Sequence, residues 1–275
     1  MSAPRAPRSP QRAGVLAALA LLGVTTAASS ARAQEAAPTA RGGGPTVGRW
    51  LYVDDGVAPA PLQAVGISRF TYTGGTTGAL RPFASNVARP GALVEAGGEV
   101  GVTPWLSLSI VGTNDGRPAA EVAASGFVAG LRVTPLGRGA TGLSLSGGVL
   151  RELGGSAGVW ARASVSRELG RLQLAATVHG EHVVAQGRDG LDVMVMAGAS
   201  YRMTGVLRAG VEYVAQDLEG AGMDGGDAEQ GMRHFVGPTV ALALHPGLTL
   251  SGGPAFGLSH GSPSSLGRIA LACAF

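Results

Sequence analysis

The chain has 275 residues, of which 14% are charged and 5% are aromatic, while glycine fills 46 positions. This composition is too apolar for a disordered chain and too rich in glycine for a helical bundle, because each interior glycine costs a helix about 1 kcal/mol relative to alanine. The formal charge of +3 arises in the first 33 residues, which hold four arginines and no acid, so that 17 arginines face 18 acids in the remainder. The composition therefore favours an all-β protein and gives no argument for a nucleic-acid partner.

The N-terminus has the three parts of an export signal. Arg5, Arg8 and Arg12 supply positive charge, residues 13–24 form an apolar stretch, and Ala31-Arg32-Ala33 matches a small-x-small cleavage site. An apolar stretch of this length is too short to cross a bilayer as a helix, which needs about 20 residues. We expect residues 1–33 to be a cleaved signal peptide and Gln34 to begin the mature chain; a short N-terminal anchor helix is the alternative.

Residues 34–61 are rich in alanine, proline and glycine, which predicts a lead-in linker before the folded part of the chain. The run Arg49-Trp50-Leu51-Tyr52-Val53 interrupts this composition. We interpret it as either a short strand or a docking segment.

From residue 62 onward, apolar and polar side chains alternate with a period of two, which is typical of β-strands. In residues 172–179, for example, Leu, Leu, Ala and Val alternate with Gln, Ala, Thr and His. The pattern predicts twelve strands, at residues 62–73, 91–103, 105–113, 120–134, 142–151, 158–168, 171–183, 190–203, 205–216, 233–244, 247–258 and 266–275.

The connections between these strands alternate between tight turns and longer loops rich in Gly, Pro, Asp and Asn. The tight turns lie near residues 103–104, 137–139, 169–171, 203–205 and 245–247. The longer loops lie near residues 74–90, 114–119, 152–157, 184–190, 217–232 and 259–265. An even number of strands would therefore have all its tight turns at one end and all its long loops at the other.

This organisation resembles the bacterial outer-membrane β-barrels over the whole of residues 62–275. The resemblance implies a closed antiparallel transmembrane β-barrel with short periplasmic turns, longer extracellular loops and both termini in the periplasm, so that residues 34–61 become a periplasmic lead-in. The last strand alternates and ends in Phe275, which is similar to the assembly signal of the class. It departs from the fuller pattern, because Cys273 stands where that signal has an aromatic residue. No motif narrows the resemblance to a characterised member.

Aromatic residues are expected near the strand ends, where interfacial girdles form in such barrels. Trp105, Tyr201 and Phe275 are assigned to the turn side, and Phe70, Tyr72, Tyr213, Phe235 and Phe256 to the loop side. Phe127 fits neither girdle. A soluble two-sheet sandwich is the alternative fold, because alternation alone does not distinguish an inner face from an outer one.

The polar face of the strands carries charges of both signs, which we expect to line the lumen: Glu95, Glu99, Arg132, Arg162, Glu181, Asp192, Arg202, Arg208, Glu212 and Arg268. Arg162 shares its phase with Trp160, so the orientation of that strand is ambiguous. The favoured interpretation is a mutually neutralised network that fills a narrow barrel. The other is the lining of a polar channel.

Three groups of residues have the side chains that catalysis or metal binding needs. The pair His260 and Ser262 is similar to part of the site of outer-membrane phospholipases, but no orienting Asn or Asp lies beside it, so a polar loop is favoured. His182 falls on the opposite strand face from His179 and Glu181, which argues against a metal site there. The acidic loop 217–229 could hold Ca²⁺ loosely or bridge to lipopolysaccharide through divalent ions, but it matches no EF-hand spacing, so a solvated loop is favoured. We therefore predict no catalytic residue, no metal and no cofactor.

The resulting hypothesis is an integral outer-membrane barrel without catalytic activity, acting as a small passive pore or as a structural component of the envelope. The alternatives are an outer-membrane lipid hydrolase and a soluble secreted β-protein. The expected partners are outer-membrane lipid, lipopolysaccharide and, during biogenesis, the barrel-assembly machinery.

Overall fold

The computed structural model describes residues 50, 52–54, 56–74, 91–114, 126–136, 140–153, 155–184, 191–216, 218, 232–259, 262 and 264–275. Residues 44–275 form one compact unit. The predicted signal peptide and most of the acidic loop 217–229 lie outside the described residues, and so does His260.

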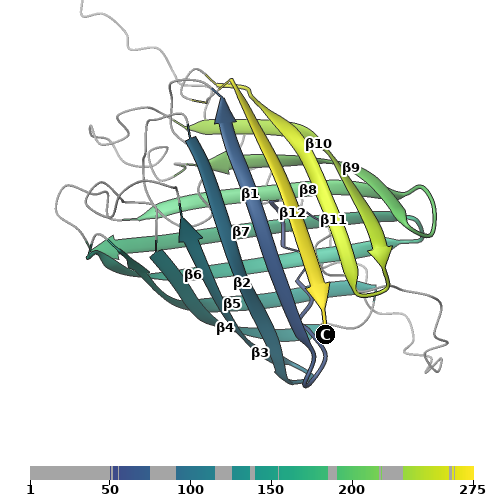
Figure 1. The fold of residues 1–275 in the computed structure, drawn as a ribbon, viewed down its shortest axis with the longest axis horizontal. Helices are drawn as coiled ribbons and strands as arrows, with labels where there is room; N and C mark the ends of the chain where they lie inside the picture. Colours follow the sequence, from purple (N-terminus) through teal and green to yellow (C-terminus); the bar gives the residue numbers. More distant parts are fainter. Residues whose placement is uncertain are drawn as a thin grey trace, which may run out of the picture. The chain divides into compact units, whose positions relative to one another are not determined.

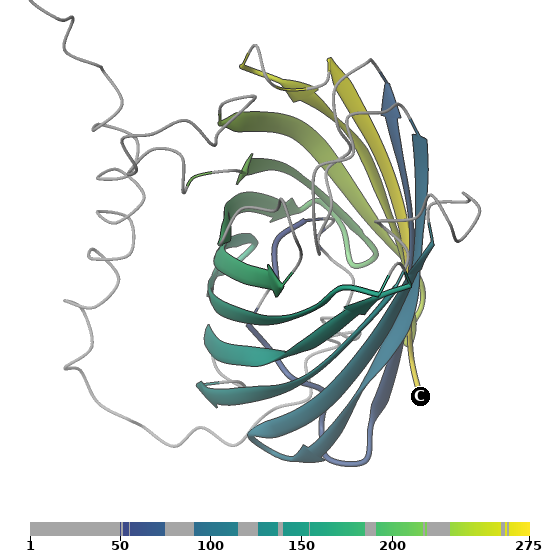
Figure 2. The ribbon, with the colours of Figure 1, turned by 90° about the vertical axis from the view of Figure 1, so that its left-hand side faces the viewer.

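The described residues form twelve antiparallel strands that close into a single barrel (Figures 1 and 2). Each strand pairs with its neighbours in sequence, and β1 pairs with β12 to complete the ring. The strands are β1 (Ala64–Gly74), β2 (Gly91–Thr103), β3 (Leu106–Asn114), β4 (Gly126–Leu136), β5 (Thr141–Glu152), β6 (Ala157–Leu169), β7 (Leu172–Val184), β8 (Asp192–Arg202), β9 (Leu207–Gln216), β10 (Arg233–His245), β11 (Leu248–Gly257) and β12 (Ser265–Ala274).

The closure between the first and last strands involves the C-terminal residue. The Phe275 N–H donates to the Ala64 carbonyl at 2.8 Å, and the Ala64 N–H donates back to the Phe275 carbonyl at 3.3 Å. Closure removes the unpaired sheet edge that an open sheet of this length would expose. The predicted barrel with twelve strands is confirmed, and the soluble two-sheet sandwich is wrong, because all twelve strands belong to one ring.

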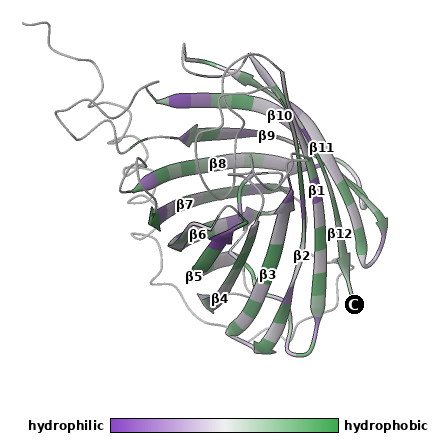
Figure 3. Ribbon diagram, turned by 60° about the vertical axis from the view of Figure 1, so that its left-hand side comes forward, coloured by the Kyte–Doolittle hydropathy of each residue, from purple (hydrophilic) through white to green (hydrophobic). Residues whose placement is uncertain are grey.

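Burial alternates along the strands as the sequence pattern predicts. Large apolar side chains on alternate positions are about half exposed on the outer surface, among them Ile110, Leu131, Leu145, Val159 and Ile269. The intervening polar side chains are buried on the inner face. Figure 3 shows the same alternation of hydropathy along the ribbon. In the described part of the chain, no helix combines the length and the hydropathy needed to cross a bilayer.

Two aromatic residues differ from their predicted positions. Phe235 is fully buried inside the barrel and does not belong to the loop-side girdle, because its phase on β10 is that of the inward-facing Arg233. Phe127 is 44% exposed and is the second residue of β4, so it lies on the outer face at the long-loop end. The predicted strand began six residues too early, at residue 120, which had moved Phe127 away from the loop-side girdle.

Candidate functional site

A segment before the first strand lies inside the barrel. We call its described residues, which are 50, 52–54 and 56–60, the inner segment. Its described residues contact side chains from β4, β6, β7, β9 and β12, strands that are distributed around the ring. It reaches the barrel wall where Pro61 bridges Gly101 at the end of β2. Of the two interpretations of residues 49–53, the structure favours the docking segment, because residues 50 and 52–54 have no strand pairing.

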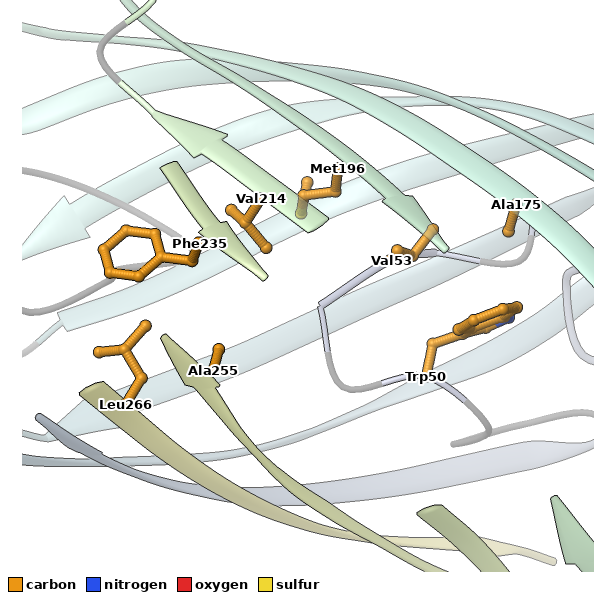
Figure 4. Packing of buried hydrophobic residues seen from close by; sticks show 8 residues of the cluster. All are labelled: Trp50, Val53, Ala175, Met196, Val214, Phe235, Ala255 and Leu266. Carbon is orange, nitrogen blue, oxygen red and sulfur yellow. The ribbon is translucent and has the colours of Figure 1, made fainter. Parts of the chain in front are cut away.

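The inner segment is anchored on one side by apolar packing. Trp50 and Val53 join a buried cluster with inward-facing residues of β7 to β12, namely Ala175, Met196, Val214, Phe235, Ala255 and Leu266 (Figure 4). Gly198 of β8 makes room for the indole, since a Cβ atom there would lie 2.6 Å from Trp50 Cζ3. The apolar cluster therefore occupies one part of the inner wall.

The backbone of the inner segment is held by side chains from two strands. The Tyr52 and Val53 N–H groups donate to one carboxylate oxygen of Glu212 on β9, at 2.8 and 3.0 Å. The Asp54 N–H donates to Thr177 Oγ1 on β7 at 3.1 Å, and the Thr177 hydroxyl lies 3.3 Å from the Asp54 carbonyl. These bonds satisfy backbone groups that have no strand partner.

The side chain of Asp54 is the centre of the charged contacts. Arg132 of β4 donates to both carboxylate oxygens, at 2.7 and 3.2 Å, and Arg162 of β6 approaches to 3.5 Å. Glu99 of β2 accepts from Arg132 Nε at 3.3 Å. Burial by itself would raise the pKa of Asp54, but the two arginines and the Gly56 N–H together hold it below the ordinary value of 3.8. Asp54 is therefore a carboxylate at neutral pH.

A second group of charges lies across the seam between β1 and β12. Glu95 of β2 lies 3.9 Å from Arg69 and 3.7 Å from Arg268. The guanidinium of Arg268 also stacks over the ring of Tyr52, 4.4 Å from its centroid, and so contacts the inner segment. These residues, with those around Asp54, occupy the middle of their strands. We define the central belt as Arg69, Glu95, Glu99, Arg132, Arg162, Glu212 and Arg268.

Six of the ten charges predicted for the lumen lie in the central belt; the other four lie nearer the ends of the barrel. Arg202 and Arg208 both pair with Glu168 at the turn end, each at 3.0 Å. Glu181 lies 3.4 Å from His179 Nε2 on β7. Asp192 begins β8 opposite Glu181 in the strand register. Trp160, whose phase was ambiguous, is buried inside with Arg162, 5.6 Å from the guanidinium carbon.

The groups considered for catalysis and metal binding do not form a site in the described residues. Ser262 contacts the backbone of β10: its hydroxyl accepts from the His234 N–H at 2.9 Å and lies 3.1 Å from the His234 carbonyl. His182 is exposed on the outer face, whereas His179 and Glu181 are buried inside. Within the described ranges, no group of three or more His, Cys, Asp or Glu residues is placed to hold a metal ion.

Sequence reasoning missed Asp54 and Arg69. Asp54 lies before the first strand, outside the alternating pattern that identified the other charges. The signal that marks it is local: Asp54-Asp55-Gly56 directly follows the one apolar run of an otherwise Ala-, Pro- and Gly-rich stretch. Arg69 shares its strand phase with Thr71, whose hydroxyl accepts a hydrogen bond from Arg268, so the alternation of β1 does indicate it.

No protein-family model and no curated protein matches this sequence. Solved structures match its fold. The KdgM porin in complex with disordered oligogalacturonate has a TM-score of 0.53 at 6% identity, covering 77% of this chain and 99% of that one. The COG4313 outer membrane channel from Pseudomonas putida F1 has a TM-score of 0.53 at 11% identity, covering 80% and 98%. The NanC porin has a TM-score of 0.51 at 8% identity, covering 76% and 98%.

These three structures are porins or channels of the outer membrane, and nearly their whole length aligns with this chain. Together with the closed ring and its apolar outer face, they establish that the chain has the fold of the bacterial outer-membrane β-barrel channels.

Proposed function

We propose that this protein is an integral outer-membrane barrel that forms a narrow passive pore without catalytic activity. The observation that carries the proposal is the central belt, which places charges of both signs at mid-depth inside a closed barrel with an apolar outer face. Dry burial of an ion costs several kcal/mol. The side chains of Arg69, Arg132 and Arg162 are 25%, 14% and 18% exposed, whereas those of Arg268 and Glu95 are 2% and 1% exposed, so the hydrated passage would run beside the first three arginines.

The inner segment limits the size of this passage. A barrel of twelve strands is wider than an eight-stranded barrel, in which side chains fill the interior. It is narrower than a porin of 16 strands. Here the inner segment takes up part of that interior. We therefore infer a pore for small polar solutes and ions with a low conductance. The similar structures are porins and an outer membrane channel, which supports the proposal of a pore.

The location and partners belong to the same proposal. The export signal would direct the chain out of the cytoplasm, and the barrel-assembly machinery would recognise the last strand, which ends in Phe275. In the outer membrane, the apolar outer face would contact lipid and, on the loop side, lipopolysaccharide.

Planar-bilayer recording of the refolded mature chain tests the pore. We expect small, steady conductance steps from protein that migrates as a folded barrel, that is, whose mobility in an SDS gel changes on heating. A heat-modifiable barrel that conducts no ions at any applied voltage would contradict the pore and leave a structural role in the envelope.

The hydrolase alternative has a separate test. The Ser262 hydroxyl forms hydrogen bonds with the backbone of β10, so this residue has a structural role in holding the loop to the strand. We expect no phospholipid or ester hydrolysis above background from the wild-type protein. Activity that the wild type has and the Ser262→Ala variant lacks would contradict the non-catalytic proposal.

A further inference from the structure

The two arginines that bind Asp54 belong to the barrel wall, whereas Asp54 itself does not. Arg132 and Arg162 project from β4 and β6, and the inner segment places Asp54 between them. The side chains of all three keep between 10% and 18% of their exposure. The carboxylate is thus a separable ligand of a site that the wall provides.

We propose that Arg132 and Arg162 form an anion-binding site in the lumen, that Asp54 is its internal ligand, and that a small monovalent anion binds there when this carboxylate is neutralised. Guanidinium groups present planar sets of donors that suit carboxylates and other oxyanions, and Arg132 already makes a two-pronged contact of this kind. The effect of the site on ion conduction rests on the proposed pore; the binding of an anion does not.

The charges that face Asp54 determine the sign of the effect. Arg132 and Arg162 are balanced by Asp54 and Glu99, and Glu99 stays in place through Arg132 Nε and the Ser107 hydroxyl. When Asp54 is counted with the central belt, four carboxylates face four arginines. The carboxylates are Asp54, Glu95, Glu99 and Glu212, and the arginines are Arg69, Arg132, Arg162 and Arg268. Loss of the Asp54 charge leaves the belt with one positive charge in excess.

An uncompensated charge in a narrow passage acts on every ion that passes. A unit charge about 4 Å from an ion in water changes the local ion concentration about fivefold. The wild-type pore should therefore discriminate little between potassium and chloride. Because the same charge attracts chloride and repels potassium, neutralising Asp54 should raise the ratio of chloride to potassium permeability by about the square of this factor, about 25-fold.

The test is the reversal potential of single pores under a gradient of KCl, at an ionic strength of about 0.1 M, where the screening length is about 10 Å. The Asp54→Asn variant keeps the size of the side chain and its oxygen acceptor for the Gly56 N–H. The matched control is Glu168→Gln, which also removes one carboxylate shared by two arginines, Arg202 and Arg208, but at the turn end of the barrel.

We expect the reversal potential to move towards the chloride equilibrium potential in Asp54→Asn and to stay near the wild-type value in Glu168→Gln. Equal reversal potentials for Asp54→Asn and wild type would overturn the proposal. An equal shift in both variants would overturn it too, because net charge and not the central site would then determine selectivity.

A second measurement does not need conduction. Iodide, a monovalent anion, and acrylamide, a neutral molecule, are compared as quenchers of tryptophan fluorescence in folded, detergent-bound protein with Trp105→Phe, which removes the outer indole. The remaining Trp50 and Trp160 are inside, and Trp160 lies 5.6 Å from the Arg162 guanidinium carbon. Asp54→Asn should increase quenching by iodide and not by acrylamide.

The two measurements separate the two proposals. If Asp54→Asn shows stronger iodide quenching and the barrel conducts no ions, the result supports the anion site and refutes the pore. Unchanged iodide quenching overturns the anion site even where the barrel conducts. Increased quenching by both agents overturns it as well, because it reports that the inner segment has left the lumen.

Discussion

Arg132 donates from both terminal nitrogens to the carboxylate of Asp54, with Nη2–Oδ2 at 2.7 Å and Nη1–Oδ1 at 3.2 Å. This ion pair joins two residues 78 positions apart in the chain and connects the wall of the barrel to the segment within it. Arg132 Nη1 also donates to the Val57 carbonyl at 3.1 Å, so one side chain holds both a carboxylate and the backbone of the inner segment.

The ion pair makes the stability of the docked inner segment dependent on pH. Because the pKa of Asp54 is held below 3.8 in the folded protein, its charge stabilises docking above this value, and the contribution is lost as the pH falls through the lowered pKa. Because Glu212 and the apolar cluster still hold the inner segment, we expect it to stay docked when Asp54 is protonated. Iodide quenching of Trp50 and Trp160 in the Trp105→Phe protein should be constant from neutral pH to about pH 4 and increase below it. Asp54→Asn should lack this Asp54-dependent transition. A transition near pH 6 in both proteins would contradict the prediction.

The indole of Trp50 depends on the absence of a side chain at position 198. A Cβ atom on Gly198 would lie 2.6 Å from Trp50 Cζ3, and overpacking of this kind costs about 1–3 kcal/mol. In Gly198→Ala we expect Trp50 to be displaced and its emission to shift to the red, while the barrel remains heat-modifiable. The control is Gly267→Ala, where a Cβ atom meets nothing within 4 Å. Identical emission spectra for Gly198→Ala and wild type would refute this account.

The outer face should respond to charge according to depth. Leu145 lies on the outer face in the middle of β5 and is 56% exposed, and Leu169 ends β6 next to the turn and is 48% exposed. Arginine near the bilayer midplane costs about 2–4 kcal/mol, and near an interface about 0–1 kcal/mol. The free energy of unfolding from lipid vesicles should therefore fall by these amounts in Leu145→Arg and Leu169→Arg. Folding of the wild type in buffer without lipid or detergent would count against the membrane assignment.

The start of the mature protein remains a prediction from the sequence. Cleavage after Ala31-Arg32-Ala33 would leave Gln34 as the first residue. Such a chain keeps the inner segment and 16 residues before it. N-terminal sequencing of protein from the envelope fraction checks this, and Met1 in that material would refute the cleaved signal.

The strands and the direction of their side chains were determined by the sequence itself. A period of two is a local property of the backbone, so the twelve strands followed from residue order, with ends that mostly agree within two residues. The exception is the start of β4, and it moved Phe127 away from the girdle where it lies. Phe235 was misplaced for a different reason: an aromatic residue near a strand end suits an interface, but its phase on β10 directs it inward.

The tertiary structure decided what fills the lumen. Alternation assigns the charges of the central belt to one face of a sheet, but only closure of that sheet makes the face an interior. Asp54 belongs to no strand, and its partners Arg132 and Arg162 lie 78 and 108 residues further along the chain. No local pattern indicates such a contact, because Gly198, Glu212 and Thr177 lie far from Asp54 in the sequence and surround the inner segment only in the closed barrel.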